Sequence, residues 1–335
     1  MEELKILNKR KILKYIFLKN NVTRKELSQV TGLSSSSVTR LINDLIEKHL
    51  IISKDKVTQS LYGRKSEILT LNPSSLRVFI IDIDVKNTVL GMGSFDGNVK
   101  ILKTITTSRN IEEFKSNIKN FIKLFNYKYD YVSFSIPGIV NVDKNIIVTA
   151  PNLGWSDMTL QSLWAEDKAV FDNDSNLCVL AEKFFSEDMQ DIQNAMYILI
   201  KDGIGGGLIL NGNLYRGRYF CAGEIGHNII VKNNFKKSLE NFFDSSLDKK
   251  ESLEDLALNI SYIVNILNLE KVIIGGKITN MSNDFFIKLK DAINDNVFVA
   301  NRENLDIRLT NFNYEPASMV GACSNAVLTF IDTII

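Results

Sequence analysis

Residues 201–217, KDGIGGGLILNGNLYRG, contain the feature that most restricts how this chain folds. Glycine occupies four of the five positions from Gly203 to Gly207, and only Ile204 interrupts the run. Because glycine has no Cβ, other groups can approach its backbone closely, and such runs often let main-chain N–H groups surround a phosphate. The run therefore indicates a phosphate-type loop, either in an enzyme that uses a nucleotide or in a relative that has lost this use.

The chain is long and apolar enough for two or three globular domains, with 335 residues of which 45% are hydrophobic. Its apolar runs, such as 78-VFII-81, are too short to cross a membrane, and the charges scattered through the N-terminal residues exclude a signal peptide. Cys178, Cys221 and Cys323 are an odd, widely spaced set without a CxxC pair. This pattern favours reduced thiols and a cytoplasmic location.

Charge is distributed unevenly along the chain. Residues 1–70 contain 14 Lys and Arg against 7 Asp and Glu, whereas the remainder contains 26 basic and 32 acidic residues. A basic head on a mildly acidic body indicates that the head meets a polyanion. On charge alone, the alternative is that solvated lysines cluster in the head by chance.

The basic head has the pattern of a winged helix-turn-helix. Thr23 and Glu26 form a capping box that begins one helix, Gly32 permits a tight turn, and Ser34 caps the next helix. Residues 50–73 read as two strands around a polar loop, which is a wing. The helix expected before them, over residues 4–19, has an apolar face at Leu4, Leu7, Ile12, Ile16 and Leu18.

The solvent side of the helix that follows Ser34 carries short hydrogen-bonding groups, which suit base edges in the major groove. These groups are Ser35, Ser36, Ser37, Thr39 and Arg40. The wing loop adds Arg64 and Lys65, and an arginine here suits the negative potential of an A·T-rich minor groove. A small helical docking module is the alternative, because serine-rich helix starts are also common caps. Order, spacing and charge together favour a DNA-binding domain over residues 1–72.

From residue 73 onward the pattern alternates between strands and helices, which indicates an α/β fold. Strands are expected within 78–105, 131–138, 168–174, 195–203 and 271–276, and helices within 111–126, 175–187 and 251–267. We expect two lobes, about 73–175 and 176–335, that flank a ligand cleft.

Four segments of the body concentrate polar side chains: 151-PNLGW-155, 171-FDNDSNLCVLAE-182, 222-AGEIGH-227 and 238-SLE-240. Carboxylates accept hydrogen bonds from neighbouring hydroxyl groups, whereas amides both donate and accept, and polyol recognition requires both kinds of group. Trp155 offers an aromatic platform for a sugar ring. Taken alone, Asn173 and Asp174 are more often a turn or a helix cap. Glu224 and His227 would face the same way on one helical turn, although a single histidine is more often a core residue.

These segments resemble the ROK family, which contains sugar-responsive repressors and sugar kinases. The similarity covers almost the whole chain and rests on GRKSEILTLNP, IPGIV, PNLGW, NDSNLCVLAE, GIGGGLILNGNLYRG, AGEIGH, VIIGG and GAC. It implies a winged helix-turn-helix followed by a two-lobed actin-like ATPase (ribonuclease H-like) fold. The head is similar to the repressor branch, that of the N-acetylglucosamine and xylose repressors, since the kinases lack it.

The resemblance also implies which side chains hold the sugar. The family uses an Asn-Asp pair, the Glu and His of a G-E-x-G-H run and a later Glu, and we add the asparagine of PNLGW. The matching residues are Asn152, Asn173, Asp174, Glu224, His227 and Glu240. In the kinases, the residue that matches Asp174 is the general base for the attacking hydroxyl. Here we expect only the relic of that position, and no catalytic residue.

The chain departs from the family at its zinc segment. A C-x-C-G-x-x-G-C-x-E segment usually binds zinc together with the histidine, but residues 232-KNNFKKSLE-240 contain no cysteine. Because only His227 remains of the four ligands, we expect no structural zinc. Glu240 is retained at the end of the segment, which predicts a sugar contact that outlasts the metal.

A further departure concerns ATP. The kinases carry D-x-G-G-T and G-T-G where this chain reads DIDVK at 82–86 and KDG at 201–203. Val85 adds a Cβ where backbone must approach phosphate, and Asp84 and Asp202 add negative charge. Two unit charges ~5 Å apart at an effective dielectric of ~20 interact by roughly 3 kcal/mol, of which Lys86 and Lys201 offset a part. We expect no ATP binding and interpret the glycine run as a relic phosphate loop that serves as a hinge.

The sequence therefore predicts a sugar-responsive transcriptional regulator, a repressor that leaves its operator when a sugar occupies the cleft. Its expected partners are double-stranded operator DNA, a sugar and further copies of itself in a homodimer or homotetramer, with no membrane. One alternative is an ATP-dependent sugar kinase with a DNA-binding head, which the departures at Asp84, Val85 and Asp202 oppose. The other is a DNA-binding protein whose body is only a dimerisation scaffold, which the retained polar set opposes.

Overall fold

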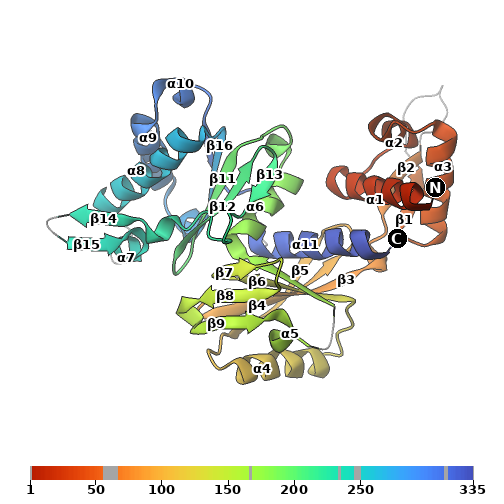
Figure 1. The fold of residues 1–335 in the computed structure, drawn as a ribbon, viewed down its shortest axis with the longest axis horizontal. Coiled ribbons are helices and arrows are strands. Elements are labelled where there is room, and N and C mark those ends of the chain that lie inside the picture. The colour runs from red at the N-terminus through yellow and green to blue at the C-terminus, as the bar shows by residue number, and fades with distance from the viewer. Residues whose placement is uncertain are drawn as a thin grey trace.

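The computed structural model describes residues 2–55, 67–165, 168–232, 235–244, 250–312 and 316–334. A small head lies beside a two-lobed body, and the chain ends next to that head (Figure 1). Within the described residues, no helix has the length and apolar character needed to span a membrane. Cys178, Cys221 and Cys323 are free thiols, as their spacing predicted.

The head has the predicted winged helix-turn-helix order. Thr23 and Glu26 form the expected capping box, the side chain of Ser34 accepts from the N–H of Ser37, and Gly32 ends the first of these helices with φ 71°. Arg64 and Lys65 of the predicted wing loop lie outside the described residues. The elements are α1 (Glu2–Lys19), α2 (Arg24–Thr31), α3 (Ser35–Glu47) and the antiparallel pair β1 (Ile51–Asp55) and β2 (Glu67–Leu71).

The predicted apolar face of α1 is partly wrong. Leu4 and Leu7 are 61% and 60% exposed, and the buried stripe contains Leu13 and Phe17 in addition to the predicted Ile12 and Ile16. At about 100° per residue, Leu4, Leu7 and Leu18 fall on the side of the helix opposite to the centre of this buried stripe. The buried side instead includes Lys9, which pairs with Asp44 of α3.

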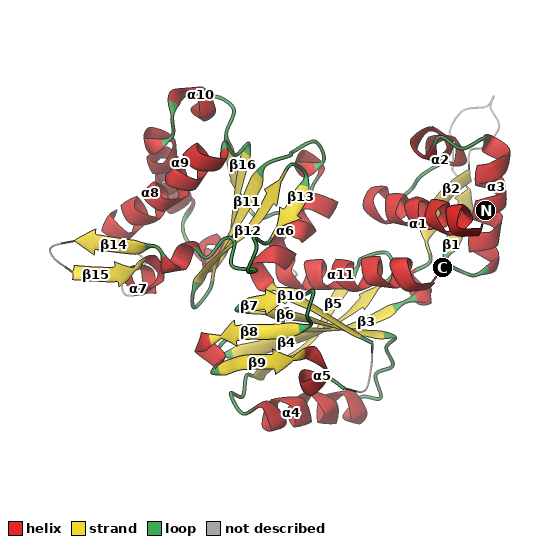
Figure 2. Ribbon diagram, viewed as in Figure 1, coloured by secondary structure: helices red, strands yellow, loops and turns green. Residues whose placement is uncertain are grey.

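The first lobe is built on a mixed sheet with strand order β10-β6-β3-β4-β5 (Figure 2). β3 pairs antiparallel with β4 and parallel with β6, and β6 pairs parallel with β10. The elements of this lobe are η1 (Pro73–Ser75), β3 (Arg77–Ile83), β4 (Asn87–Ser94), β5 (Val99–Thr106), α4 (Ile111–Leu124), β6 (Tyr131–Ile136), β7 (Ile139–Asn141), β8 (Ile146–Ala150), η2 (Pro151–Leu153), β9 (Trp155–Thr159), α5 (Leu160–Leu163) and β10 (Ala169–Asn173).

The second lobe repeats this arrangement, with strand order β13-β12-β11-β16-β17. In both sheets an antiparallel meander is followed by parallel strands, as the two-lobed α/β prediction requires. The elements of this lobe are η3 (Glu187–Met189), β11 (Ala195–Ile200), β12 (Ile204–Leu210), β13 (Asn213–Tyr215), η4 (Ile225–His227), β14 (Ile229–Lys232), β15 (Phe235–Ser238), α7 (Leu239–Asp244), α8 (Lys250–Leu267), β16 (Lys271–Gly276), η5 (Lys277–Asn280), α9 (Asn283–Asn296), α10 (Val299–Arg302) and β17 (Asp306–Leu309).

Helices α6 (Asp174–Phe185) and α11 (Ala317–Ile334) pack against each other where the lobes meet. The sequence division at about residue 175 assigned α11 to the second lobe. In the structure, α11 lies against β3, β6 and β10 of the first sheet, and its Ala326, Val327 and Ile331 share a hydrophobic core with the head. A contact between segments so distant in sequence leaves no local signal.

Most of the glycine run is not a loop, so the expected hinge is wrong: Gly203 lies in the turn after β11, and Ile204–Gly207 begin a strand. β12 begins at Ile204 and pairs antiparallel with β11. A Cβ on Gly205 would overlap the hydroxyl of Ser175, and one on Gly207 would overlap the carbonyl oxygen of Ser175. The glycines therefore let the first turn of α6 lie directly on the main chain of the strand.

We predict that Gly207→Ala lowers the free energy of unfolding by about 1–3 kcal/mol or more, because the new methyl group meets backbone that cannot rotate away. Gly203→Ala is the matched control, since its Cβ would have only the Glu240 carboxylate oxygen close by, at 3.2 Å. Urea unfolding of both variants measures the difference. Equal losses at the two positions would contradict the proposed close contact.

Candidate functional site

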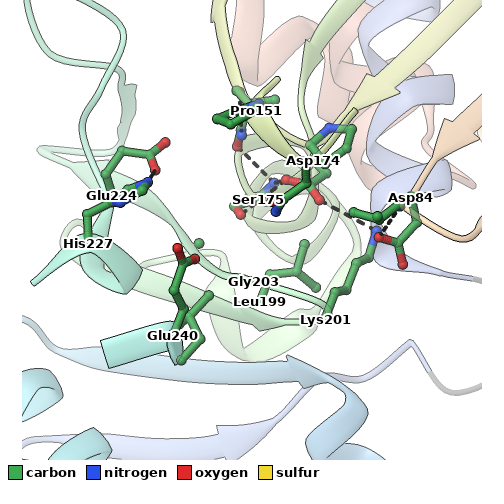
Figure 3. Close-up of a pocket in the computed structure, with 17 residues that line it drawn as sticks. Asp84, Pro151, Asp174, Ser175, Leu199, Lys201, Gly203, Glu224, His227 and Glu240 are labelled. Atoms are coloured by element: carbon green, nitrogen blue, oxygen red, sulfur yellow. Dashed lines mark hydrogen bonds and ion pairs between the residues drawn. The ribbon is translucent and has the colours of Figure 1, made fainter. Parts of the chain in front are cut away.

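A cavity between the lobes gathers the predicted sugar-binding residues (Figure 3). They come from η2, the junction of β10 with α6, η4 and α7. The residues that line the cavity include Asn152, Asn173, Asp174, Glu224, His227 and Glu240. The fold thus brings four segments that are well separated in the sequence to one place.

Asn173 has a structural task within this set. Its Oδ1 accepts from the N–H groups of Ser175 at 2.9 Å and Asn176 at 3.1 Å, which caps α6. Its Nδ2 donates to the carbonyl of Gly138 at 2.9 Å. The helix-cap alternative therefore holds for Asn173, whose side chain fixes the start of α6 against the cavity wall.

Asp174 faces a buried ammonium group. Its Oδ2 lies 3.5 Å from Lys201 Nζ, and the same Nζ lies 4.0 Å from Oδ1 of Asp82 at the end of β3. Burial raises the pKa of the Asp174 carboxyl, and Lys201 opposes this rise. Burial alone would lower the pKa of Lys201, but Asp82 and Asp174 reverse the effect, so the ammonium stays charged.

Neither ion pair of Lys201 is a close hydrogen bond. Within the described residues, Lys201 Nζ and Asp82 Oδ1 are buried without a hydrogen-bond partner. A buried donor without an acceptor is costly, so Lys201 is ready to donate to a group that enters the cavity.

Glu224 and His227 lie close together, with 3.7 Å between Glu224 Oε2 and His227 Nε2, and the spacing predicted that they face the same way. Burial raises the pKa of Glu224, His227 opposes the rise, and Asp174 and Glu240 add to it. Glu240 Oε2 lies 3.2 and 3.1 Å from the positions that a Cβ would take on Gly203 and Gly226. These glycines leave room for the Glu240 carboxylate at the cavity.

Of the residues that replace the zinc segment, Lys232 and Phe235–Ser238 lie in the antiparallel strand pair β14–β15, and α7 then carries Glu240 to the cavity. Among the residues that the structure describes, no group of three or more His, Cys, Asp or Glu is arranged to hold a metal. His227 has no cysteine near it in this segment, so the donor set does not fit a tetrahedral zinc site. The absence of zinc stays a prediction.

Trp155 is not a sugar platform, contrary to the sequence interpretation. It is 4% exposed, its Nε1 donates to the carbonyl of Arg109 at 2.9 Å, and its ring packs edge-on against Phe114.

The sequence analysis did not identify Ser175 as a residue of the cavity and gave Lys201 only a minor part. Lys201 directly follows the apolar strand 195–200, and such strand ends lie at the cleft of α/β folds, so this rule could have found it.

Asp202, at a turn where the sequence comparison with the kinases expected a loss of phosphate binding, is paired with lysines. Asp202 hydrogen bonds to Lys277 and lies 3.5 Å from Lys86 Nζ, and the bond to Lys277 lowers the pKa of Asp202. Lys86 belongs to the first lobe and Asp202 to the second, so this ion pair crosses the cleft. Asp84 and Val85 line the cavity itself.

Four of the five α3 side chains that the sequence assigns to DNA lie at the surface. Ser35, Ser36, Thr39 and Arg40 are exposed, whereas Ser37 is half-buried and hydrogen bonds to Ser34. Arg24 of α2 holds the surface in place. Its Nε donates to Glu67 Oε2 of β2 at 2.6 Å, and its Nη2 donates to Asn43 Oδ1 of α3 at 3.2 Å.

We predict that Lys201→Met costs about 3–5 kcal/mol of stability at neutral pH, because it leaves buried carboxylates uncompensated. The control Lys86→Met removes a side chain that is 76% exposed and should cost at most ~1 kcal/mol. Urea unfolding measures both. The loss in Lys201→Met should shrink as the pH falls through the raised pKa of Asp174, since protonation removes the unpaired charge. A loss that does not change with pH would contradict the pairing.

Comparison with known proteins agrees with this architecture. Residues 80–242 match the sequence model of the ROK family, and residues 7–52 match that of the winged helix-turn-helix DNA-binding domain. The chain is 25% identical over 373 residues to the xylose repressor of Caldicellulosiruptor bescii, covering 92% of each chain. It is 28% identical over 286 residues to the xylose repressor of Bacillus subtilis, covering 80% of this chain and 74% of the relative.

A solved structure has the same fold over nearly the full length. It is a ROK family transcriptional regulator, a homologue of the E. coli MLC protein, with a TM-score of 0.76, 19% identity and 98% coverage of both chains. The chain therefore carries a ROK family domain behind an N-terminal winged helix-turn-helix.

Proposed function

We propose that this protein is a transcriptional repressor that binds operator DNA through its head and releases the DNA when a sugar occupies the interlobe cavity. The observation that carries the proposal is the meeting of carboxylate, amide, imidazole and ammonium groups from separate segments in one cavity, in a chain with a DNA-binding head. The names of the two xylose repressors support D-xylose as the sugar.

The cavity offers a sugar both acceptors and donors. Asp174 and Glu224 accept from hydroxyl groups, and Lys201 donates to a hydroxyl oxygen. A sugar hydroxyl bound to both Lys201 Nζ and Asp174 Oδ2 would accept a hydrogen bond from the lysine and donate one to the aspartate. This would satisfy the buried ammonium group. Asn152 and Glu240 are the further contacts that we assign, and Asn173 acts mainly by positioning.

We propose further that the protein does not transfer phosphate. The carboxylate at the relic base position, Asp174, is paired with Lys201, and Val85 lines the cavity where a glycine backbone is needed. The residues present do not fit a triphosphate, because Asp84, where the kinases have glycine, adds negative charge at the cavity. Steady ADP release with any sugar in a panel would favour the kinase alternative.

The head reads one half-site, so we propose that the protein acts as a homodimer on a palindromic operator. Ser35, Ser36, Thr39 and Arg40 are the exposed side chains that we assign to the major groove. The wing residues Arg64 and Lys65 remain assigned to DNA by sequence alone. A body that only joined two heads would not need the convergent polar cavity.

We predict that Asp174→Asn and Glu224→Gln each weaken D-xylose binding by about 10- to 100-fold, because hydrogen bonds to charged groups contribute ~1.5–3 kcal/mol. Both variants should bind operator DNA like the wild type when no sugar is present, and they should no longer release it. Calorimetry with D-xylose and gel shifts on operator DNA measure the two properties. Asp143→Asn, at an exposed turn of the first lobe, is the control. Variants that stay fully inducible would refute the assignment of the cavity.

We predict that Arg40→Ala weakens operator binding by about 1–3 kcal/mol and leaves D-xylose affinity unchanged, as expected for a contact with a base edge. Arg77→Ala, an exposed arginine of the body, is the matched control. Fluorescence anisotropy at one fixed salt concentration gives the affinities. The same comparison with Arg64→Ala tests the wing, and unchanged binding in both head variants would refute this DNA surface.

A further inference from the structure

Helix α6 has one end in the sugar cavity and the other end at the DNA-binding head. Its N-cap Asn173 and its first residues Asp174 and Ser175 line the cavity. Its last residues, Phe184 and Phe185, contact Phe17 of α1, with ring centroids 6.4 and 5.5 Å apart in edge-on geometry. At ~1.5 Å per residue the helix spans roughly 18 Å between these contacts.

The first turns of α6 are held by main-chain contacts on two sides. Gly207 of β12 meets the carbonyl of Ser175, and Gly321 of α11 meets the carbonyl of Leu177, so closely that a Cβ at either glycine would overlap these oxygens. Side chains can absorb small displacements by rotating, but main chain packed on main chain cannot. A displacement of Asp174 is therefore passed to the helix as a whole.

The far end of α6 is equally well connected. Phe17 is 3% exposed, and a Cβ on Gly97, in the turn between β4 and β5, would lie 2.8 Å from Phe185 Cζ and 3.1 Å from Phe17 Cε2. Lys19 at the end of α1 hydrogen bonds to Gln190, which lies just beyond η3. The head thus rests on the C-terminal end of the same helix that begins at the sugar cavity.

We propose that α6 couples the sugar cavity to the DNA-binding head, and that the cluster of Phe17, Phe184 and Phe185 is the contact through which the head follows the helix. This inference rests on the proposed function, because it explains how sugar binding changes operator affinity. Sugar that holds Asp174 and Lys201 favours one position of α6, and the operator favours another. Each ligand then shifts the equilibrium by its difference in affinity for the two positions.

The test separates coupling from binding. The 335-residue chain is titrated with a DNA duplex recovered by in vitro selection on the same chain, with and without saturating D-xylose. In the wild type, D-xylose should raise the dissociation constant of the duplex by about 5- to 150-fold. In Phe185→Ala this ratio should fall to about one, while calorimetric D-xylose affinity and sugar-free operator affinity stay close to wild type.

Phe121→Ala is the matched control, because Phe121 of α4 is also half-buried and packs against aromatic rings but lies outside the sugar cavity and the contact with the head. It should keep the wild-type ratio. Phe17→Leu retains apolar volume in the head and should also lower the ratio, so the test does not depend on one variant. A wild-type ratio in both Phe185→Ala and Phe17→Leu would overturn the role of α6. No response of the wild-type protein to D-xylose would instead overturn the proposed function.

Discussion

The direct contact between the glycine strand β12 and the first turn of α6 is the constraint on which the rest of the structure depends. Gly205 and Gly207 allow the main chain of Ser175 to lie on the strand. This contact fixes where α6 begins and hence where Asp174 and the Asn173 cap face the cavity. The glycine run therefore provides the surface against which α6 packs, and α6 carries Asp174 of the sugar cavity.

The electrostatics of the cleft follow from one buried lysine. Lys201 lies near the carboxylates of Asp82 and Asp174, which belong to different elements of the fold, and it balances charge that burial would otherwise disfavour. Asp202 crosses the cleft to Lys86 in a similar way. The carboxylates of Asp82, Asp174 and Asp202 thus each lie near a lysine of the chain itself, and Lys201 keeps a donor ready for a hydroxyl group.

Much of the architecture could be predicted because its signals are local. The Thr23–Glu26 capping box, the Ser34 cap and the strand and helix alternation of the body are short patterns, and the structure confirms them. The polar set of the cavity was found because each member lies in a short motif of the family. The prediction that Trp155 forms a sugar platform failed because the sequence does not show whether the face of an aromatic ring is exposed or covered. In the structure, Phe114 covers the Trp155 ring.

By itself, the sequence determined the winged helix head, the α/β class of the body and the residue types that suit a sugar, since periodicity, caps and charge depend on neighbouring residues. Only the tertiary structure decided that the glycine run is a strand, that α11 returns to the first sheet and that Lys201 reaches Asp174. It also decided that α6 ends against Phe17 of the head. These are contacts between surfaces far apart along the chain, and they exist only once the backbone has brought those surfaces together.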